Sequence, residues 1–170
     1  MKRLLALASL AIAAPVWSAD FGVGVSAKSN DSTIYVPIDI NDSFRVEPLV
    51  RYSKDTSVFA GGRSKYETYE IGTGLFKLYP LTESIHIYYG GRLSYLNLKA
   101  ETNFQAPVVD FNRSSSDGYR IAPTLGFEYF FKKHLSIGGE AQWYYSDLEA
   151  NRQDVSATGT NTNLILRLRF

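Results

Sequence analysis

The residues of this chain that could do chemistry are few. It has two histidines and no cysteine among 170 residues, which excludes disulfides, a thiol nucleophile and thiolate metal sites. One group has a catalytic spacing, because His134 and Ser136 are two positions apart and Glu140 follows closely. A lipid-deacylating hydrolase could use such a histidine as the general base for the serine, with a carboxylate nearby. Two histidines without cysteine are too few for a usual metal site, so we expect neither a metal nor a cofactor.

The N-terminus has the three parts of a secretory signal: a basic pair, an apolar run over residues 4–14, and a cleavage region. Cleavage after either Ser18 or Ala19 fits the pattern. A membrane anchor is disfavoured, because the run is too short to span a bilayer. We predict a signal peptide over 1–19, secretion through the inner membrane, and one mature domain over 20–170. This domain carries 16 basic residues (18 − 2) against 17 acidic ones, a balance that does not suggest nucleic-acid binding.

The mature chain alternates apolar and polar residues in segments cut by turn residues, which predicts β-strands with one apolar face. No later apolar run approaches the ~18 residues that a transmembrane helix needs. Eight such segments lie at about 20–28, 33–40, 44–54, 66–79, 85–97, 118–131, 135–147 and 160–170. Their connections alternate between short (41–43, 80–84, 132–134) and mostly longer (55–65, 98–117, 148–159). Short turns at one end and longer loops at the other are typical of outer-membrane barrels.

The two faces of these segments differ in character. One face carries glycine and charge, whereas the other is apolar with aromatic residues near its ends: Phe44, Tyr52, Tyr69, Tyr79, Tyr119, Phe131, Trp143, Tyr145 and Phe170. A soluble β-sandwich also alternates, but it gives no reason for the aromatic ends or for the loop asymmetry. We therefore predict an all-β fold, an eight-stranded antiparallel transmembrane up-and-down β-barrel.

The same alternation directs ten charged side chains into the barrel: Arg45, Arg51, Arg92, Arg120, Arg167, Arg169, Glu47, Glu70, Glu128 and Glu140. The interior of an eight-stranded barrel is just wide enough for side chains, and buried charges must be paired. The inward glycines leave room for the long arginines. We expect a largely plugged, charge-paired lumen. The alternative is a narrow, porin-like ion path lined by charge.

A few residues do not suit this pattern. Pro37, Pro48 and Pro123 fall inside predicted strands, where each removes a donor from the ladder, so we expect bulges there or strand ends placed closer. Lys77 falls on the lipid-facing side, near the end that carries the short turns, where it could snorkel. His86 is expected in the lumen or at an interface.

Three stretches resemble a known family. Residues 34–40 (IYVPIDI) followed by 44–48 (FRVEP) look like its second hairpin, 126–140 (GFEYFFKKHLSIGGE) looks like its strand–turn–strand unit before the last hairpin, and 167–170 (RLRF) resembles its Phe-ended assembly signal. The family is the outer-membrane β-barrels that include the OmpA transmembrane domain and OmpX-like proteins. The resemblance covers the whole mature chain and implies the outer membrane of a Gram-negative bacterium. It also implies a structural role, a surface for adhesion or host interaction, or a small channel.

We therefore expect a non-enzymatic protein with a structural or surface-interaction role, and we assign no catalytic, cofactor-binding or metal residue. His134 lies in a short turn that matches the non-catalytic family, at the wrong end for lipid A. The expected partners are outer-membrane lipids and lipopolysaccharide, and the barrel-assembly machinery through Phe170. A surface ligand could bind the loops 55–65, 98–117 and 148–159, although the second could instead extend the strands on either side. We expect a monomer.

Overall fold

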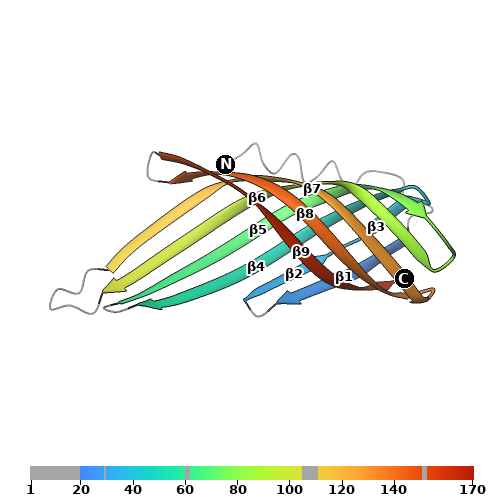
Figure 1. Ribbon diagram of the computed structural model, residues 1–170, viewed down its shortest axis with the longest axis horizontal. Coiled ribbons are helices and arrows are strands. Elements are labelled where there is room, and N and C mark those ends of the chain that lie inside the picture. The colour runs from blue at the N-terminus through green and yellow to red at the C-terminus, as the bar shows by residue number, and fades with distance from the viewer. Residues whose placement is uncertain (1–19, 29, 60–61, 105–110, 151–152) are drawn as a thin grey trace.

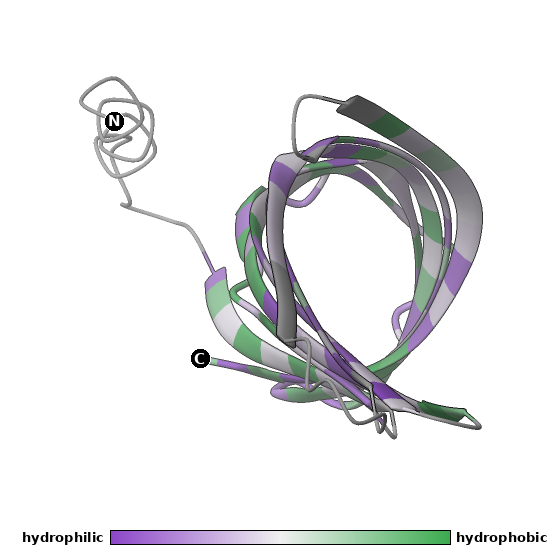
Figure 2. Cartoon of the chain, turned by 90° about the vertical axis from the view of Figure 1, so that its left-hand side faces the viewer, coloured by the Kyte–Doolittle hydropathy of each residue, from purple (hydrophilic) through white to green (hydrophobic). Residues whose placement is uncertain are grey.

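The computed structural model describes residues 20–28, 30–59, 62–104, 111–150 and 153–170. Within these ranges all regular structure is β, in nine antiparallel strands: β1 (Asp20–Lys28), β2 (Asp31–Tyr35), β3 (Ile38–Asn41), β4 (Phe44–Phe59), β5 (Gly62–Pro80), β6 (Ile85–Phe104), β7 (Phe111–Lys132), β8 (Leu135–Ala150) and β9 (Gln153–Arg169). The first strand pairs with the last, so the sheet closes into a barrel. Figure 1 shows the tilted strands from the side, and Figure 2 shows the closed ring from one end.

The nine described strands occupy eight strand positions around the barrel, which we call staves. There are eight because β2 and β3 together form one stave, interrupted at Val36 and Pro37. Both pieces pair with β1 on one side and β4 on the other. Across the break, the Val36 amide donates to the carbonyl of Pro48 at 2.9 Å. The eight-stranded barrel is confirmed, but the prediction of one continuous strand over 33–40 was wrong, because Pro37 has no N–H to donate.

The other two prolines stay inside long strands. Pro48 lies within β4 and Pro123 within β7, and the pairing of β4 with β5 and of β6 with β7 continues past them without a register shift. The bulges expected at these positions are therefore wrong. The pairing of β7 with β8 skips Ala122 and Pro123 but resumes at Thr124 in the same register, and Pro48 faces the break between β2 and β3, where its carbonyl accepts from Val36. The register shifts lie beside turns, between Asp39 and Asn41 and between Phe130 and Lys132.

The two faces of the barrel are as the alternation predicts. On β9, Leu164, Leu166 and Leu168 are 45–65% exposed on the outer surface, whereas the intervening Ile165 and Arg167 are fully buried. Figure 2 shows this alternation as hydrophobic and hydrophilic bands along the strands. The outer surface is therefore apolar and the interior polar, the reverse of a soluble globular domain.

The strands run further than the sequence predicts at one end. β4 and β5 continue to Phe59 and from Gly62, and β6 and β7 continue to Phe104 and from Phe111. The predicted loops 55–65 and 148–159 are therefore mostly paired strands, and for 98–117 the alternative that it extends the strands on either side is confirmed; only the central residues of the three lie outside the described ranges. Polar segments can pair in this way because ladder hydrogen bonds join backbone groups, whatever the side chains.

The two ends of the barrel differ. The turn end carries the short connections 42–43, 81–84 and 133–134, together with Asp20 and Phe170. The hairpin end carries the extended strand pairs, which project in Figure 1. Exposed aromatic side chains ring both ends of the apolar outer surface: Phe21, Phe44, Tyr79, Tyr129, Phe131 and Phe170 at the turn end, and Tyr52, Tyr69, Tyr119, Trp143 and Tyr145 at the hairpin end. Among the described residues, no helix is long and apolar enough to cross a membrane.

Candidate functional site

The candidate site is the charged interior of the barrel. All ten charged residues predicted to point inward do so, and each takes part in at least one ion pair. Two further carboxylates join them, Asp31 and Asp39. Sequence reasoning missed both. Asp31 lies between the predicted segments 20–28 and 33–40. Asp39 is an even number of positions from the inward Thr33 and Tyr35, so the alternation of faces could have placed it in the lumen.

The most buried pairs surround Glu47, which has no solvent exposure. Arg92 Nη2 lies 2.6 Å from Glu47 Oε1 and 2.6 Å from Glu140 Oε1, so one guanidinium bridges two carboxylates. Arg167 Nη2 lies 3.0 Å from Glu47 Oε2. The hydroxyl of Tyr88 donates to Glu140 Oε1 at 3.0 Å. Residues from β4, β6, β8 and β9 thus meet at one point of the lumen.

A second set of pairs lies nearer the turn end. Arg45 Nε donates to Asp39 Oδ1 at 2.6 Å, and Arg45 Nη2 lies 3.0 Å from Glu128 Oε2. Arg169 contacts Asp39 as well and lies 3.2 Å from Glu128 Oε2. The hydroxyl of Ser136 donates to Glu128. Because Arg45 also lies 4.0 Å from Glu47, both sets form one array, which we call the turn-side network.

The turn-side network is electrically balanced. It contains four arginines (Arg45, Arg92, Arg167, Arg169) and four carboxylates (Asp39, Glu47, Glu128, Glu140). Aromatic rings fill the space between the guanidinium groups. Arg45 and Arg167 lie 5.5 and 5.3 Å from the ring centre of Tyr88, within cation–π range. Glycine makes room: a Cβ at Gly138 would lie 3.1 Å from Arg167 Nη1.

A smaller set of pairs, the hairpin-side cluster, occupies the lumen nearer the hairpin end. Arg51 binds Asp31 through both its Nε, at 2.9 Å, and its Nη2. Arg120 Nη1 donates to Glu70 Oε2 at 2.8 Å, and Arg51 Nη1 lies 3.6 Å from the same oxygen. Arg120 also stacks 4.7 Å from the ring centre of Tyr144. This cluster is also balanced, with two arginines and two carboxylates.

Three apolar side chains separate the two charged layers. Tyr35, Leu49 and Ile165 form a buried cluster. Along its strand, each lies between a residue on the turn side and one on the hairpin side; Leu49, for example, lies between Glu47 and Arg51. On β2, β4 and β9 the lumen therefore holds an apolar layer between its two charged parts, with Tyr35 and Leu49 at most 5% exposed.

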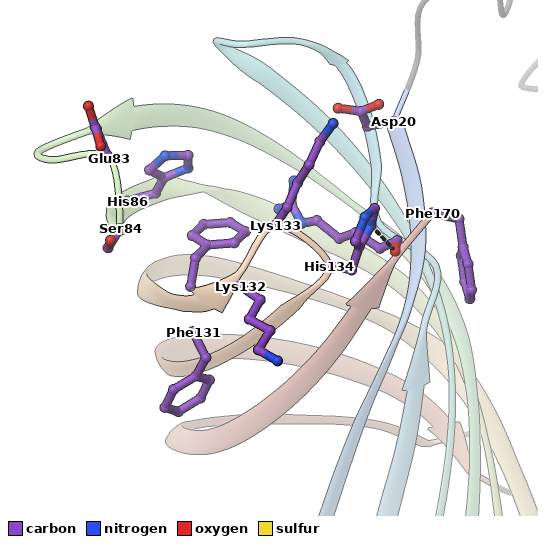
Figure 3. Close-up of a pocket in the computed structure, with 11 residues that line it drawn as sticks. Asp20, Glu83, Ser84, His86, Phe131, Lys132, Lys133, His134 and Phe170 are labelled. Atoms are coloured by element: carbon purple, nitrogen blue, oxygen red, sulfur yellow. Dashed lines mark hydrogen bonds between the residues drawn. The ribbon is translucent and has the colours of Figure 1, made fainter.

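The mouth at the turn end holds a pocket of about 490 Å³. Figure 3 shows Lys132, Lys133 and His134 around it, with the C-terminal Phe170 beside them. His86 was expected in the lumen or at an interface; it also lines this pocket at the mouth of the lumen, with its ring 4.8 Å from that of Phe130.

The histidine and serine with catalytic spacing do not form a pair in this mouth. His134 Nδ1 lies 3.1 Å from the carbonyl oxygen of Arg169. Ser136 is fully buried, and its hydroxyl donates to Glu128. Glu140 is engaged with Arg92 and Tyr88 deeper in the lumen. The three residues thus point to three separate sets of partners.

The projecting strands at the hairpin end carry charge on their outer face. Lys65 Nζ lies 2.8 Å from Glu67 Oε1, and this hydrogen bond lowers the pKa of the Glu67 carboxyl and raises that of Lys65. Lys99 lies 5.4 Å from the ring centre of Tyr69. The aromatic ring of the barrel is therefore followed directly by a polar, charged sheet that continues outside the apolar surface.

Comparison with known proteins finds likeness in structure and none in family or close sequence. No protein-family model matches the chain, and no relative was found among curated proteins. The crystal structure of Neisserial surface protein A superimposes with a TM-score of 0.59 at 18% identity, over 89% of this chain and 94% of that one. A major outer membrane protein of Thermus thermophilus gives 0.62 at 12% identity, over 90% and 100%.

A third solved structure is Ail, the attachment invasion locus protein of Yersinia pestis, in complex with the heparin analogue sucrose octasulfate. It gives a TM-score of 0.53 at 13% identity, over 89% of this chain and 95% of that one. These likenesses confirm the predicted fold, that of the small outer-membrane β-barrels. The apolar outer surface around a charged interior is that of a membrane-spanning barrel, in agreement with the predicted location in an outer membrane.

Proposed function

We propose that this protein has a structural or surface-interaction role in an outer membrane, with a lumen closed by paired charges and no enzymatic activity. The proposal of a closed lumen is supported mainly by the turn-side network, in which the charges of arginines and carboxylates balance. Four of its eight residues, Arg45, Glu47, Glu128 and Arg167, are at most 1% exposed. These ion pairs join side chains from β4, β6, β8 and β9 across the lumen, and breaking one of them would leave an uncompensated buried charge.

Single-channel recording in a planar lipid bilayer tests the closed lumen. We expect no stable open state from the wild-type barrel. A variant with Glu47→Ala, Leu49→Ala and Arg92→Ala removes one charge of each sign and thins the apolar layer, so it is the control that should conduct. Reproducible discrete current steps from the wild type would overturn the plug and favour the narrow, porin-like channel.

The surface role is supported by the strands that project at the hairpin end. They carry charge on their outer face, including Lys65, Glu67 and Lys99, and a rigid barrel supports them. Of the structural neighbours, Ail is an attachment protein that was solved with a heparin analogue. Exposed segments on rigid scaffolds often carry binding functions.

Shortening one projecting hairpin tests this role. Replacement of residues 100–114 by a two-residue Asn-Gly turn joins the paired residues Lys99 and Ser115 and should leave the barrel folded, because the replaced positions lie beyond the aromatic ring at Tyr95 and Tyr119. Bacteria that carry the shortened protein should lose binding to immobilised heparin or to host-cell monolayers. Binding equal to that of the wild type on both surfaces would exclude this hairpin as the contact.

The absence of enzymatic activity is supported by the separation of His134 and Ser136, whose side chains bind Arg169 and Glu128. Incubation of the folded protein with lipopolysaccharide, followed by mass spectrometry of lipid A, should show no change in acyl-chain number. Loss of an acyl chain that depends on Ser136 would establish a lipid-modifying enzyme instead.

A further inference from the structure

The lipid-facing surface carries one charge that the rest of the barrel does not explain. On the described staves, every outward position between the two aromatic rings is uncharged except Lys77 of β5. Lys77 is exposed, and among the described residues its ammonium group has no hydrogen bond or ion pair. A charge on the membrane-facing side is costly and marks a functional position by default.

Lys77 stands at one end of a groove on the outer surface. It lies between aromatic neighbours on both adjacent strands, with Phe44 opposite it on β4 and Tyr89 opposite it on β6. The groove has a volume of about 550 Å³ and is lined almost entirely by apolar atoms, within the range of roughly 300–1,000 Å³ typical of ligand pockets.

The groove is polar at one end and apolar at the other. Lys77 and Asn41 lie at its outer end, and Asn41 immediately precedes the turn at 42–43. Val46 and Leu75 pair with each other one outward position further into the membrane. The polar end is therefore level with the membrane boundary and the apolar end lies inside it. A phospholipid is arranged in the same way, with its polar headgroup at the membrane boundary and its apolar acyl chains inside the membrane.

We propose that this groove binds one phospholipid of the membrane leaflet at the turn end, with the headgroup phosphate on Lys77 and an acyl chain against Val46 and Leu75. An ammonium is a point-charge phosphate binder, and it costs less near the membrane boundary when it meets an anion. The inference rests on the membrane placement of the barrel and not on its surface role. In barrels of this architecture the short turns face the periplasm, so the lipid belongs to the inner leaflet.

Native mass spectrometry of the folded barrel in detergent, titrated with phosphatidylglycerol, tests the site. The wild type should retain one lipid more tightly than all others. Lys77→Gln should weaken that binding about tenfold. Val46→Trp, which fills the apolar end, should weaken it without any change of charge. Lys99→Gln is the matched control, because Lys99 is an outward lysine at the hairpin end and its loss should have no effect.

Three further measurements separate the possible outcomes. Diacylglycerol, which lacks the phosphate, should not be retained, and inorganic phosphate should not displace the lipid. A gel shift between boiled and unboiled samples shows that each variant is folded, so a lost lipid cannot be mistaken for a lost barrel. Equal retention by the wild type and by Lys77→Gln would mean that Lys77 only extends to the interface and holds no lipid, and the proposal would fail.

Discussion

Glu47→Gln is the substitution that most directly tests whether the lumen charges need one another. Glu47 accepts hydrogen bonds from Arg92 Nη2 at 2.6 Å and from Arg167 Nε and Nη2 at 3.1 and 3.3 Å. Hydrogen bonds to charged groups contribute about 1.5–3 kcal/mol each. The three do not add, because Arg92 keeps Glu140 at 2.6 Å and Arg167 keeps Glu140 at 3.5 Å. We therefore expect a loss of about 3–5 kcal/mol, the range for breaking a buried ion pair.

The assay is equilibrium urea unfolding in lipid vesicles, followed by the fluorescence of Trp143 and by gel mobility without boiling. Glutamine has nearly the same volume as glutamate, so the change removes charge without making a cavity. Glu67→Gln is the matched control. Glu67 forms one ion pair on the outer face with Lys65, and such surface pairs contribute at most about 1 kcal/mol.

A result near that of Glu67→Gln, below about 1 kcal/mol, would refute the reasoning. It would mean that water screens the lumen charges enough for Arg92 and Arg167 to remain stable with one carboxylate fewer. The apolar layer at Leu49 would then not exclude water from the turn-side network, and the porin-like path would become the better account of the interior.

Three shorter predictions follow from other parts of the barrel. Gly126→Ala should destabilise the protein by about 1–3 kcal/mol in the same unfolding assay, because the new Cβ would lie 2.3 Å from the buried ring of Tyr88. Gly91→Ala is its control: the new Cβ would meet nothing closer than 3.8 Å, so the stability should stay within about 0.5 kcal/mol of the wild type. Phe170→Ser should lower the amount of barrel in the outer-membrane fraction, measured by immunoblot; unchanged amounts would exclude Phe170 as an assembly signal. The membrane-embedded wild type should migrate differently on a detergent gel before and after boiling, and a soluble periplasmic protein with no such shift would contradict the membrane placement.

The alternation of side chains was sufficient to predict most of the fold. A period of two places successive residues on opposite faces of a strand, so the outward Leu164, Leu166 and Leu168 and the inward Arg167 could be assigned without knowledge of neighbouring strands. The same parity predicted all ten inward charges. The alternation did not predict the interruption at Pro37, which divides one strand position into β2 and β3, because that interruption depends on the missing backbone N–H and not on the side-chain pattern.

The ends of the strands could not be predicted, because polar residues pair as well as apolar ones once a hairpin has begun. The predicted loops 55–65 and 148–159 have no clear apolar pattern, yet most of their residues continue the ladders of β4, β5, β8 and β9. Cross-strand hydrogen bonds between backbone groups decide where these strands stop, and single-strand periodicity does not contain that information.

What the sequence determined by itself is which side chains enter the lumen; what only the tertiary structure decided is which of them meet. Arg167 binds Glu47 across 120 positions of the chain, and that pairing depends on the register of every stave between them. The division into two balanced charged layers around Tyr35, Leu49 and Ile165 has the same origin. The alternation of inward and outward side chains depends on one strand alone. Which inward side chains meet depends on the register of all the strands, because closure of the barrel brings residues of distant strands to the same level of the lumen.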